Sequence, residues 1–199
     1  MQIALSDRLI LASASPRRIE LMKRTGLPFD PIPANIEESV MPNESPRRHV
    51  LRLARGKTRC IANTHPESWV IGADTIVFID GEIIGKPSTP EDARMILEKL
   101  SGRTHQVFTG FCIMNIERET TISEVVRSSV IFRDIGADEI SWYTDTPEPY
   151  DKAGAYAVQG ISAVFIRGIK GSFTNVMGLP MCEIIEKLRI AGAIRFVRE

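Results

Sequence analysis

The run from Trp69 to Ile79 constrains the fold of this chain more than any other part of the sequence. It is nearly continuously apolar and rich in β-branched residues, a pattern typical of a buried strand. Asp80-Gly81 follows at once and predicts a tight hairpin turn into a second strand, Glu82 to Ile84. We therefore expect a buried strand pair near the middle of the chain and an antiparallel pairing in its sheet.

Signals for strands and helices interleave along the rest of the sequence. Arg8 to Ala12 is typical of a buried strand, and Ser15 with Pro16 marks the start of a helix. Thr89 and Asp92 begin another helix with a variant of the capping box. Further helices are predicted over 45–63, 138–145 and 180–189, and further strands over 106–116, 121–133, 163–169 and 172–176. This order favours an α/β fold with a mixed sheet flanked by helices, built as a single domain over residues 1–199.

The charge balance and the cysteines exclude several classes of function. Lys and Arg total 25, as do Asp and Glu, so no global field would attract a nucleic acid polymer or an anionic membrane. The three cysteines form no metal-binding or disulfide pattern. No stretch approaches the roughly 18 apolar residues of a membrane span, and the N-terminal apolar run is too short for a signal peptide. We expect a cytoplasmic protein whose anionic ligands are held by local charge.

Asp74 is the first candidate functional residue, because it lies in the middle of the apolar run. Burying a carboxylate costs several kcal/mol, as an order of magnitude, unless it is paired or bound to a metal. Two interpretations stay open from the residues alone. Asp74 either caps a neighbouring helix or pairs with a buried arginine, or it binds a cation as part of a functional site.

Lys57 is the second candidate. On a helical wheel it falls within the apolar face that Val50 and Leu53 define, whereas four arginines, at positions 48, 52, 55 and 59, cluster on the opposite side and are predicted to face water. An inward lysine must either extend to the edge of the apolar face or meet an anion.

The turn from Ser13 to Arg18 is the third candidate, because a helix N-terminus offers free backbone N–H groups and Arg17 and Arg18 add donors suited to phosphate. Helix capping alone explains the same residues. Lys86 adds a cation beside a tight turn that does not match a P-loop.

The remaining inventory favours phosphate chemistry. Nucleophile motifs and metal-binding histidine pairs are missing from the sequence. What is left is a set of carboxylates and cations suited to Mg²⁺-assisted reactions of phosphates, namely Glu37, Glu38, Asp74, Arg17, Lys57, Lys86 and Lys152.

With these residues, the chain resembles the Maf family of nucleoside triphosphate pyrophosphatases from about Leu9 to Leu188. Six ordered blocks carry the resemblance: 13–18 (SASPRR), 72–77 (GADTIV), 85–87 (GKP), 100–110 (LSG, then H, V, T and G), 151–160 (DKAGAY to QG) and 175–180 (NV, then GLP). The resemblance implies an elongated mixed sheet of the inosine-triphosphatase-like type with an active cleft between two lobes. A homodimer would be usual for such a family.

The resemblance also implies a reaction, in which a nucleoside triphosphate and water give the monophosphate and pyrophosphate with Mg²⁺ or Mn²⁺. Asp74 matches the family's proton acceptor, and Arg17, Thr75 and Gln159 match positions that mark the subfamily acting on dTTP and UTP. The segment Ile36-Glu37-Glu38 departs from the family pattern, which leaves open which glutamate reaches the metal.

We expect an enzyme that removes dTTP, UTP and modified pyrimidine nucleotides. The expected catalytic residues are Asp74, Glu38, Lys57 and Lys86, the substrate-binding residues are Ser13, Arg17, Thr75 and Gln159, and the metal ligands are Glu38 and Asp74. Two alternatives are a 7-methyl-GTP pyrophosphatase, which Gln159 and its block disfavour, and a nucleotide-binding regulator of cell division.

Overall fold

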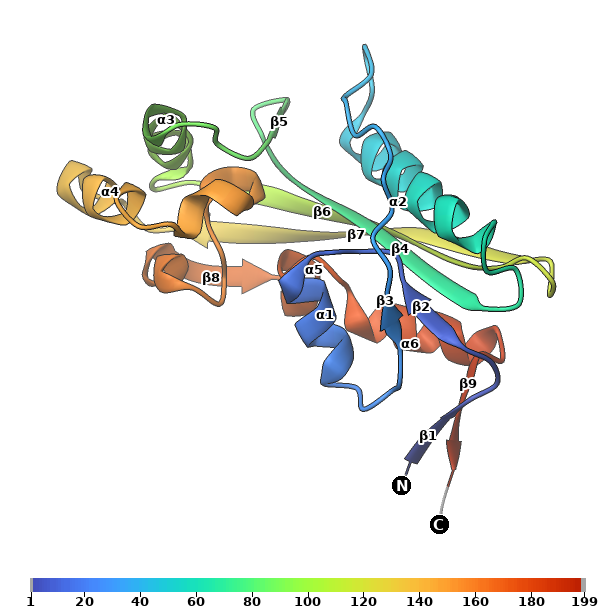
Figure 1. Cartoon of the computed structure of the whole chain (residues 1–199). Helices are drawn as coiled ribbons and strands as arrows, with labels where there is room; N and C mark the ends of the chain where they lie inside the picture. The colour runs from blue at the N-terminus through green and yellow to red at the C-terminus, as the bar shows by residue number, and fades with distance from the viewer. Residues whose placement is uncertain (1, 198–199) are drawn as a thin grey trace. The chain divides into compact units, whose positions relative to one another are not determined.

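The computed structural model describes residues 2–197 of the chain (Figure 1). The chain divides into two compact units. Unit 1 comprises Met1–Asp74, Thr109–Val126 and Gly178–Glu199, and unit 2 comprises Thr75–Phe108 and Arg127–Met177. Three long strands, β4 (Trp69–Ile79), β6 (Thr104–Asn115) and β7 (Thr120–Phe132), contribute residues to both units. The single domain expected over residues 1–199 stays a prediction.

The sheet of the protein is mixed, as the sequence predicts. Its strands follow the order β3-β2-β4-β6-β7-β8, and β5 pairs with β4 off this path. In unit 1, β2 (Leu9–Leu11) pairs in parallel with β3 (Asp30–Pro31) and with the start of β4, where Leu9 lies opposite Trp69. In unit 2, β5 (Glu82–Ile84) and β8 (Ile166–Lys170) pair antiparallel with the ends of β4 and β7.

The helices of unit 1 cover both faces of its part of the sheet. Figure 1 shows α2 (Pro46–Ala62) on one face, with α1 (Pro16–Lys23) and α6 (Met181–Ile190) on the other. The apolar core beneath α2 contains Ile10, Ala54, Val70 and Cys112, all buried. No helix in the described part of the chain is long and apolar enough to cross a bilayer.

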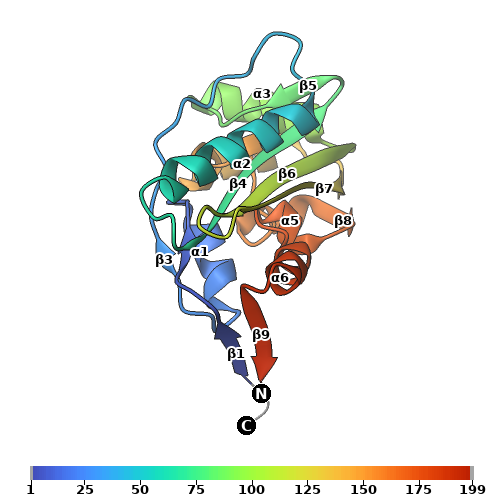
Figure 2. The ribbon, with the colours of Figure 1, turned by 90° about the vertical axis from the view of Figure 1, so that its right-hand side faces the viewer.

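Two glycines let α2 approach the sheet closely, as Figure 2 shows for its course across β4 and β6. A Cβ atom on Gly72 of β4 would lie 2.4 Å from the hydroxyl of Thr58 and 2.8 Å from the Ala54 carbonyl. A Cβ atom on Gly110 of β6 would lie 2.5 Å from the Val50 carbonyl oxygen. The helix backbone therefore rests against the strand backbones, and this seating sets where the inward side chains of α2 end.

The two ends of the described chain form a separate ribbon in unit 1. Strand β1 (Gln2–Leu5) pairs antiparallel with β9 (Ile194–Val197), so that Gln2 lies opposite Val197. Neither strand was predicted, and the helix expected to close the chain at 180–189 is followed by β9. Each strand is four residues long, which is too short for a reliable alternation of apolar and polar residues.

Unit 2 packs its helices around an aromatic core. Helix α3 (Pro90–Leu100) begins with the predicted capping box, in which Thr89 and Asp92 bond reciprocally. The helix buries Ala93, Leu97 and Leu100 against Phe132 and other core residues. Helix α4 (Ala137–Thr144) confirms the prediction for 138–145.

Two strand predictions in unit 2 need correction. Residues 172–176 form a short helix, α5 (Phe173–Val176), because the Ser172 hydroxyl accepts from the Asn175 amide and caps a helical turn. The strand expected over 163–169 begins only at Ile166, since the 3₁₀ turn η3 (Ile161–Phe165) precedes it. Two further 3₁₀ turns, η1 (Glu148–Asp151) and η2 (Ala153–Ala155), lie between α4 and η3.

Candidate active site

A buried lysine with two carboxylates lies at the centre of the candidate site in unit 1. The Lys57 ammonium is 2.7 Å from Oδ1 of Asp74 and 2.8 Å from Oε1 of Glu38. The Lys57 and Asp74 side chains are only 9% and 8% exposed, whereas Glu38 is 55% exposed. The inward lysine therefore meets anions, and Asp74 pairs with this lysine.

The seating of α2 explains how the pair forms. Thr58 follows Lys57 in the helix and lies against Gly72, two residues before Asp74 in β4. The Thr58 hydroxyl donates to the Ala54 carbonyl at 2.7 Å, inside the same close contact. Lys57 is adjacent to Thr58, and Asp74 lies two residues after Gly72. Because Thr58 and Gly72 are in contact, the lysine and the aspartate meet with both side chains buried.

Glu38 is the glutamate that contacts Lys57. Its neighbour Glu37 accepts a hydrogen bond from the Ser39 hydroxyl at 2.9 Å instead. The segment between β3 and α2 has no regular secondary structure, so Glu38 reaches Lys57 from a loop.

The start of α1 lies in the same unit. Ser15 is the N-cap position, as predicted, but its hydroxyl caps no backbone amide in the described range. The Ser13 hydroxyl, which is buried, accepts from the Ser15 amide at 3.1 Å and so shapes the turn. Arg17 is half-buried at the second helical position.

Arg18 has a role that sequence reasoning missed. Its guanidinium donates to the carbonyls of Gly178 at 2.7 Å and Ala73 at 2.9 Å. Burial lowers the pKa of this guanidinium, and the nearby charge of Asp74 opposes that shift. Arg18 therefore ties the first turn of α1 to the backbone beside Asp74, and its interpretation as a donor to phosphate stays a prediction. The Ser-Pro-Arg-Arg pattern does not say which arginine turns inward.

The water-facing prediction for Arg52 is also wrong. Both its Nε and its Nη2 contact the buried Glu44 carboxylate, at 2.6 and 2.7 Å. A helical wheel considers only residues of the helix itself, and Glu44 precedes the helix. Arg48, Arg55 and Arg59 are exposed, as expected.

The remaining predicted residues belong to unit 2. Thr75 is half-buried, and Lys86 and Gln159 are exposed. Lys152, another candidate cation, has its ammonium 2.7 Å from the Glu148 carbonyl and also contacts Asp151. Their roles as substrate contacts stay predictions.

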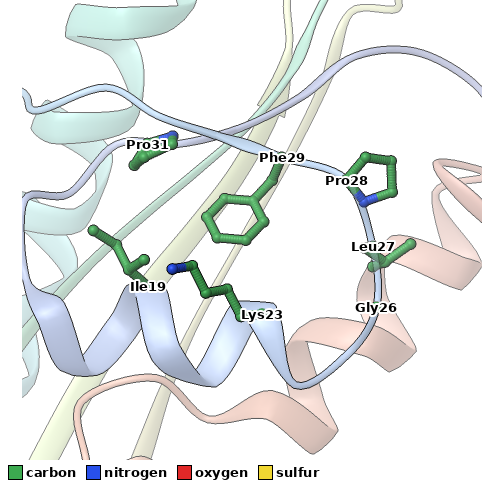
Figure 3. A pocket seen from close by; sticks show the side chains of 7 residues that line it. All are labelled: Ile19, Lys23, Gly26, Leu27, Pro28, Phe29 and Pro31. Atoms are coloured by element: carbon green, nitrogen blue, oxygen red, sulfur yellow. The ribbon is translucent and has the colours of Figure 1, made fainter.

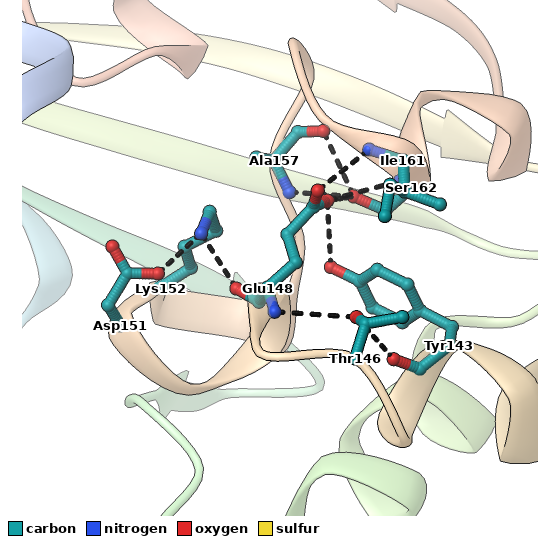
Figure 4. Close-up of polar contacts among 8 residues, drawn as sticks. All are labelled: Tyr143, Thr146, Glu148, Asp151, Lys152, Ala157, Ile161 and Ser162. Atoms are coloured by element: carbon teal, nitrogen blue, oxygen red, sulfur yellow. Dashed lines mark hydrogen bonds and ion pairs between the residues drawn. The ribbon is translucent and has the colours of Figure 1, made fainter.

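Gln159 lies in the sequence between Ala157 and Ile161, and Glu148 holds the Ile161 end of this segment (Figure 4). The amide of Gly160 donates to the carbonyl of Ala157, which closes the turn around Gln159. The Glu148 carboxylate accepts from the amides of Ile161 at 2.8 Å and Ser162 at 3.1 Å. Burial raises the pKa of this carboxyl, but these hydrogen bonds outweigh burial and the net shift is downward. The segment that carries Gln159 is thus fixed by a carboxylate that stays ionised.

A family model described as Maf-like protein matches residues 8–191. This chain belongs to the Maf family. It is 50% identical over 192 residues to a dTTP/UTP pyrophosphatase of Syntrophus aciditrophicus (strain SB), covering 96% of this chain and 94% of the relative. A dTTP/UTP pyrophosphatase of Geobacter sp. (strain M21) is 50% identical over 189 residues, covering 95% and 98%. Among solved structures, the Staphylococcus aureus Ham1 protein is 16% identical, with a TM-score of 0.48 over 79% of this chain and 90% of that one.

The acidic residues of this Maf chain fit a magnesium ion that also binds substrate. The described residues contain no cluster of three or more His, Cys, Asp or Glu side chains placed to hold a metal. Mg²⁺, however, is commonly bound through one or two carboxylates together with phosphate oxygens of the substrate. Glu38 and Asp74, which share the Lys57 ammonium, supply such a pair.

A separate cavity of about 470 Å³ in the Maf chain lies between α1 and the segment that follows it (Figure 3). Ile19, Leu27, Phe29 and Pro31 give it mostly apolar walls, and Lys23 lies at its edge. None of the predicted site residues lines it. The cavity therefore does not mark the candidate active site.

Proposed function

We propose that this Maf-family chain hydrolyses dTTP and UTP to the nucleoside monophosphate and pyrophosphate. The observation that carries the proposal is the buried Lys57–Asp74 pair with Glu38 beside it, in a chain that matches pyrophosphatases over almost its full length. A buried, charged cluster of this kind is costly to maintain for stability alone. Its residues are those that hydrolysis of a phosphoanhydride requires.

Lys57 provides positive charge to the triphosphate. Together with Arg17 and Lys86, it would hold the β- and γ-phosphates as one leaving unit and offset the charge that develops on them. The start of α1 would add the positive end of its helix dipole near the same anion, whereas the Ser13 and Ser15 amides already bond within the turn and Pro16 has no N–H. Pyrophosphate is then the expected leaving group, which places water attack at the α-phosphorus.

Asp74 is the proposed proton acceptor for the attacking water. Its carboxylate oxygens can accept a proton, and the contact with Lys57 holds the side chain in place at the site. Glu38 and Asp74 would hold a divalent cation, Mg²⁺ or Mn²⁺, which would neutralise phosphate charge and polarise the P–O bonds when bound. Because Glu38 is more than half exposed, it can change partners more readily than Asp74.

Gln159 is the proposed reader of the base. Uracil and thymine present a carbonyl acceptor at position 4 next to the N3–H donor, and one amide can satisfy both. Cytosine reverses this pair and would require the amide to flip. The methyl group that distinguishes thymine from uracil is worth only ~1–3 kcal/mol, so both nucleotides should be accepted.

Separation of the products by anion exchange tests the reaction. Pyrophosphate and a monophosphate are expected from dTTP and UTP, whereas stepwise release of orthophosphate with a diphosphate intermediate would contradict the mechanism. A panel that adds CTP, GTP, 7-methyl-GTP and a modified pyrimidine nucleotide separates the alternatives. Preference for 7-methyl-GTP would support the other enzyme class, and binding without turnover would support a regulator.

Lys57→Met tests the site itself, because methionine keeps the apolar stem and removes the charge. We expect a lower kcat, a higher KM, or both. Arg59→Ala is the matched control, since Arg59 is exposed on the same helix. Equal activity of the two variants would contradict the assignment of Lys57.

A further inference from the structure

The inward-turned Arg52 belongs to a buried polar cluster that the mechanism does not use. Its guanidinium binds both oxygens of Glu44, whose side chain is only 6% exposed. The same carboxylate contacts Nδ1 of His49 at 2.9 Å and accepts the Met41 amide at 3.2 Å. His49 and Arg52 thus both face one buried carboxylate, and Nη2 of Arg52 lies 3.3 Å from the same Nδ1.

Arg52 also makes a contact that the ion pair does not require. Its Nη2 donates to the backbone carbonyl of Ser39 at 2.9 Å. Ser39 directly follows Glu38, whose carboxylate contacts Lys57 in the next turn and a half of the same helix. Arg52 of α2 therefore holds the backbone of Ser39, and Lys57 of the same helix holds the carboxylate of the adjacent Glu38.

The loop that carries Glu38 depends on such contacts. It has no ladder of backbone hydrogen bonds over 33–40, and Glu38 itself is 55% exposed. Ile36 packs close above Gly56 of α2, because a Cβ on that glycine would lie 3.1 Å from its Cδ1. Ile36 and Ser39 thus dock on α2 on both sides of Glu38, and the second of these anchors is Arg52.

We propose that Arg52 is a positioning residue, which fixes the loop so that Glu38 lies at Lys57, and that Arg52 affects hydrolysis through Glu38. This inference rests on the proposed function for its kinetic consequence and on the loop contacts for its structural one. The planar fork of arginine can hold Glu44 and the Ser39 carbonyl together, whereas the single ammonium of a lysine cannot satisfy the same set. A positive charge alone at position 52 is therefore insufficient to hold both Glu44 and the loop backbone at Ser39.

Three variants test the kinetic consequence. Arg52→Gln should lower kcat for dTTP by roughly tenfold to a hundredfold, the range expected when a catalytic group is displaced by about 1 Å. Arg52→Lys should recover thermal stability, because it keeps a charge opposite Glu44, but should not recover kcat. Arg59→Gln, an exposed substitution on the same helix, should change neither.

A double-variant cycle distinguishes positioning from general destabilisation. If Arg52 acts through Glu38, Arg52→Gln should slow the Glu38→Gln enzyme by less than about twofold, all assays being run well below the melting temperatures. If Arg52→Gln lowers kcat by the same factor in the wild type and in the Glu38→Gln enzyme, the inference is overturned. Full recovery of kcat by Arg52→Lys would overturn it as well.

Amide hydrogen exchange tests the anchoring without any turnover. Exchange of the Met41 amide, which donates to the Glu44 carboxylate, should accelerate by at least about tenfold in Arg52→Gln relative to the wild type and to Arg59→Gln. Unchanged exchange would overturn the inference even if the enzyme hydrolyses dTTP. If the wild type hydrolyses neither dTTP nor UTP, the proposed function is overturned. Faster exchange in Arg52→Gln than in the wild type would still support the anchoring in that case.

Discussion

His105 should make the stability of this Maf protein strongly dependent on pH between about 4 and 6.5. Its ring is 1% exposed, its Nε2 lies 2.7 Å from the Tyr156 hydroxyl, and its Nδ1 has no partner among residues 2–197. The imidazolium form needs an acceptor for both N–H groups, and this site offers at most one. Burial accordingly lowers the pKa of His105 from 6.5 to about 4.

The size of the effect follows from that shift. Between the two values the unfolded chain binds a proton that the folded protein does not, so the free energy of unfolding decreases as pH falls through this window. A shift of about 2.5 pH units corresponds to about 3.4 kcal/mol at 1.36 kcal/mol per unit. About 2.2 kcal/mol of it should be lost between pH 6.5 and 4.5.

Urea unfolding at a series of pH values between 7.5 and 4.5, followed by tryptophan fluorescence, measures this loss. Carboxyl groups whose pKa is lowered in the folded protein reduce the free energy of unfolding mainly at lower pH. Arg133, for example, lowers the pKa of Glu139 from 4.5 to about 2, so the stability that Glu139 contributes is lost mainly below the His105 window. The comparison variant is His105→Phe, which keeps the edge-to-face ring contacts with Phe132 and Tyr156. At pH 7.5 it should be less stable than the wild type by about 1–3 kcal/mol, the cost of the unpaired Tyr156 hydroxyl, but it should lack the loss of stability that His105 causes as the pH falls. Parallel curves for the wild type and His105→Phe would refute the reasoning.

Three further predictions concern the site. Asp74→Asn should abolish hydrolysis. It should also lower the free energy of unfolding by up to about 3 kcal/mol, because Lys57 then keeps Glu38 alone of its two carboxylate partners. Activity within about tenfold of the wild type would exclude Asp74 as the proton acceptor. Gly72→Ala should cost about 1–3 kcal/mol or more and lower kcat, because its methyl group pushes α2 away from β4, whereas Gly85→Ala, with open space around its Cβ, should be nearly neutral in thermal melting. Gln159→Leu should flatten the ranking of kcat/KM across dTTP, UTP, CTP and GTP, and an unchanged ranking would contradict base recognition by Gln159.

Local signals predicted the parts of this structure whose causes are local. The capping box at Thr89 depends on residues within one turn, and it appears as expected. The charged residues at positions 57 and 74 lie within apolar patterns. Each indicated a partner of opposite charge, because burying either charge alone is too costly. The sequence did not show that the two are partners of each other, since that depends on how Gly72 seats the helix.

The errors fall where a partner is distant or where a short motif has two structural uses. Arg52 was assigned to solvent because its partners, Glu44 and Ser39, lie outside the helix whose periodicity was considered. The apolar pattern at 172–176 suits a strand equally well, and the serine cap decides for a helix. Strand β1 was missed because its pairing partner lies at the other end of the described chain.

The pairing of β1 with β9 has a consequence for biosynthesis. The two strands are separated by nearly the whole described chain, so β1 leaves the ribosome long before its partner exists. At roughly 5–20 residues per second, the intervening residues take about 10 to 40 s to translate. Throughout that interval β1 lacks the strand with which it pairs in the folded protein, so both of its edges are open to association with other nascent chains. Formation of the ribbon must therefore be a late event in folding, and recruitment of β1 by another chain is a route to misassembly in this protein.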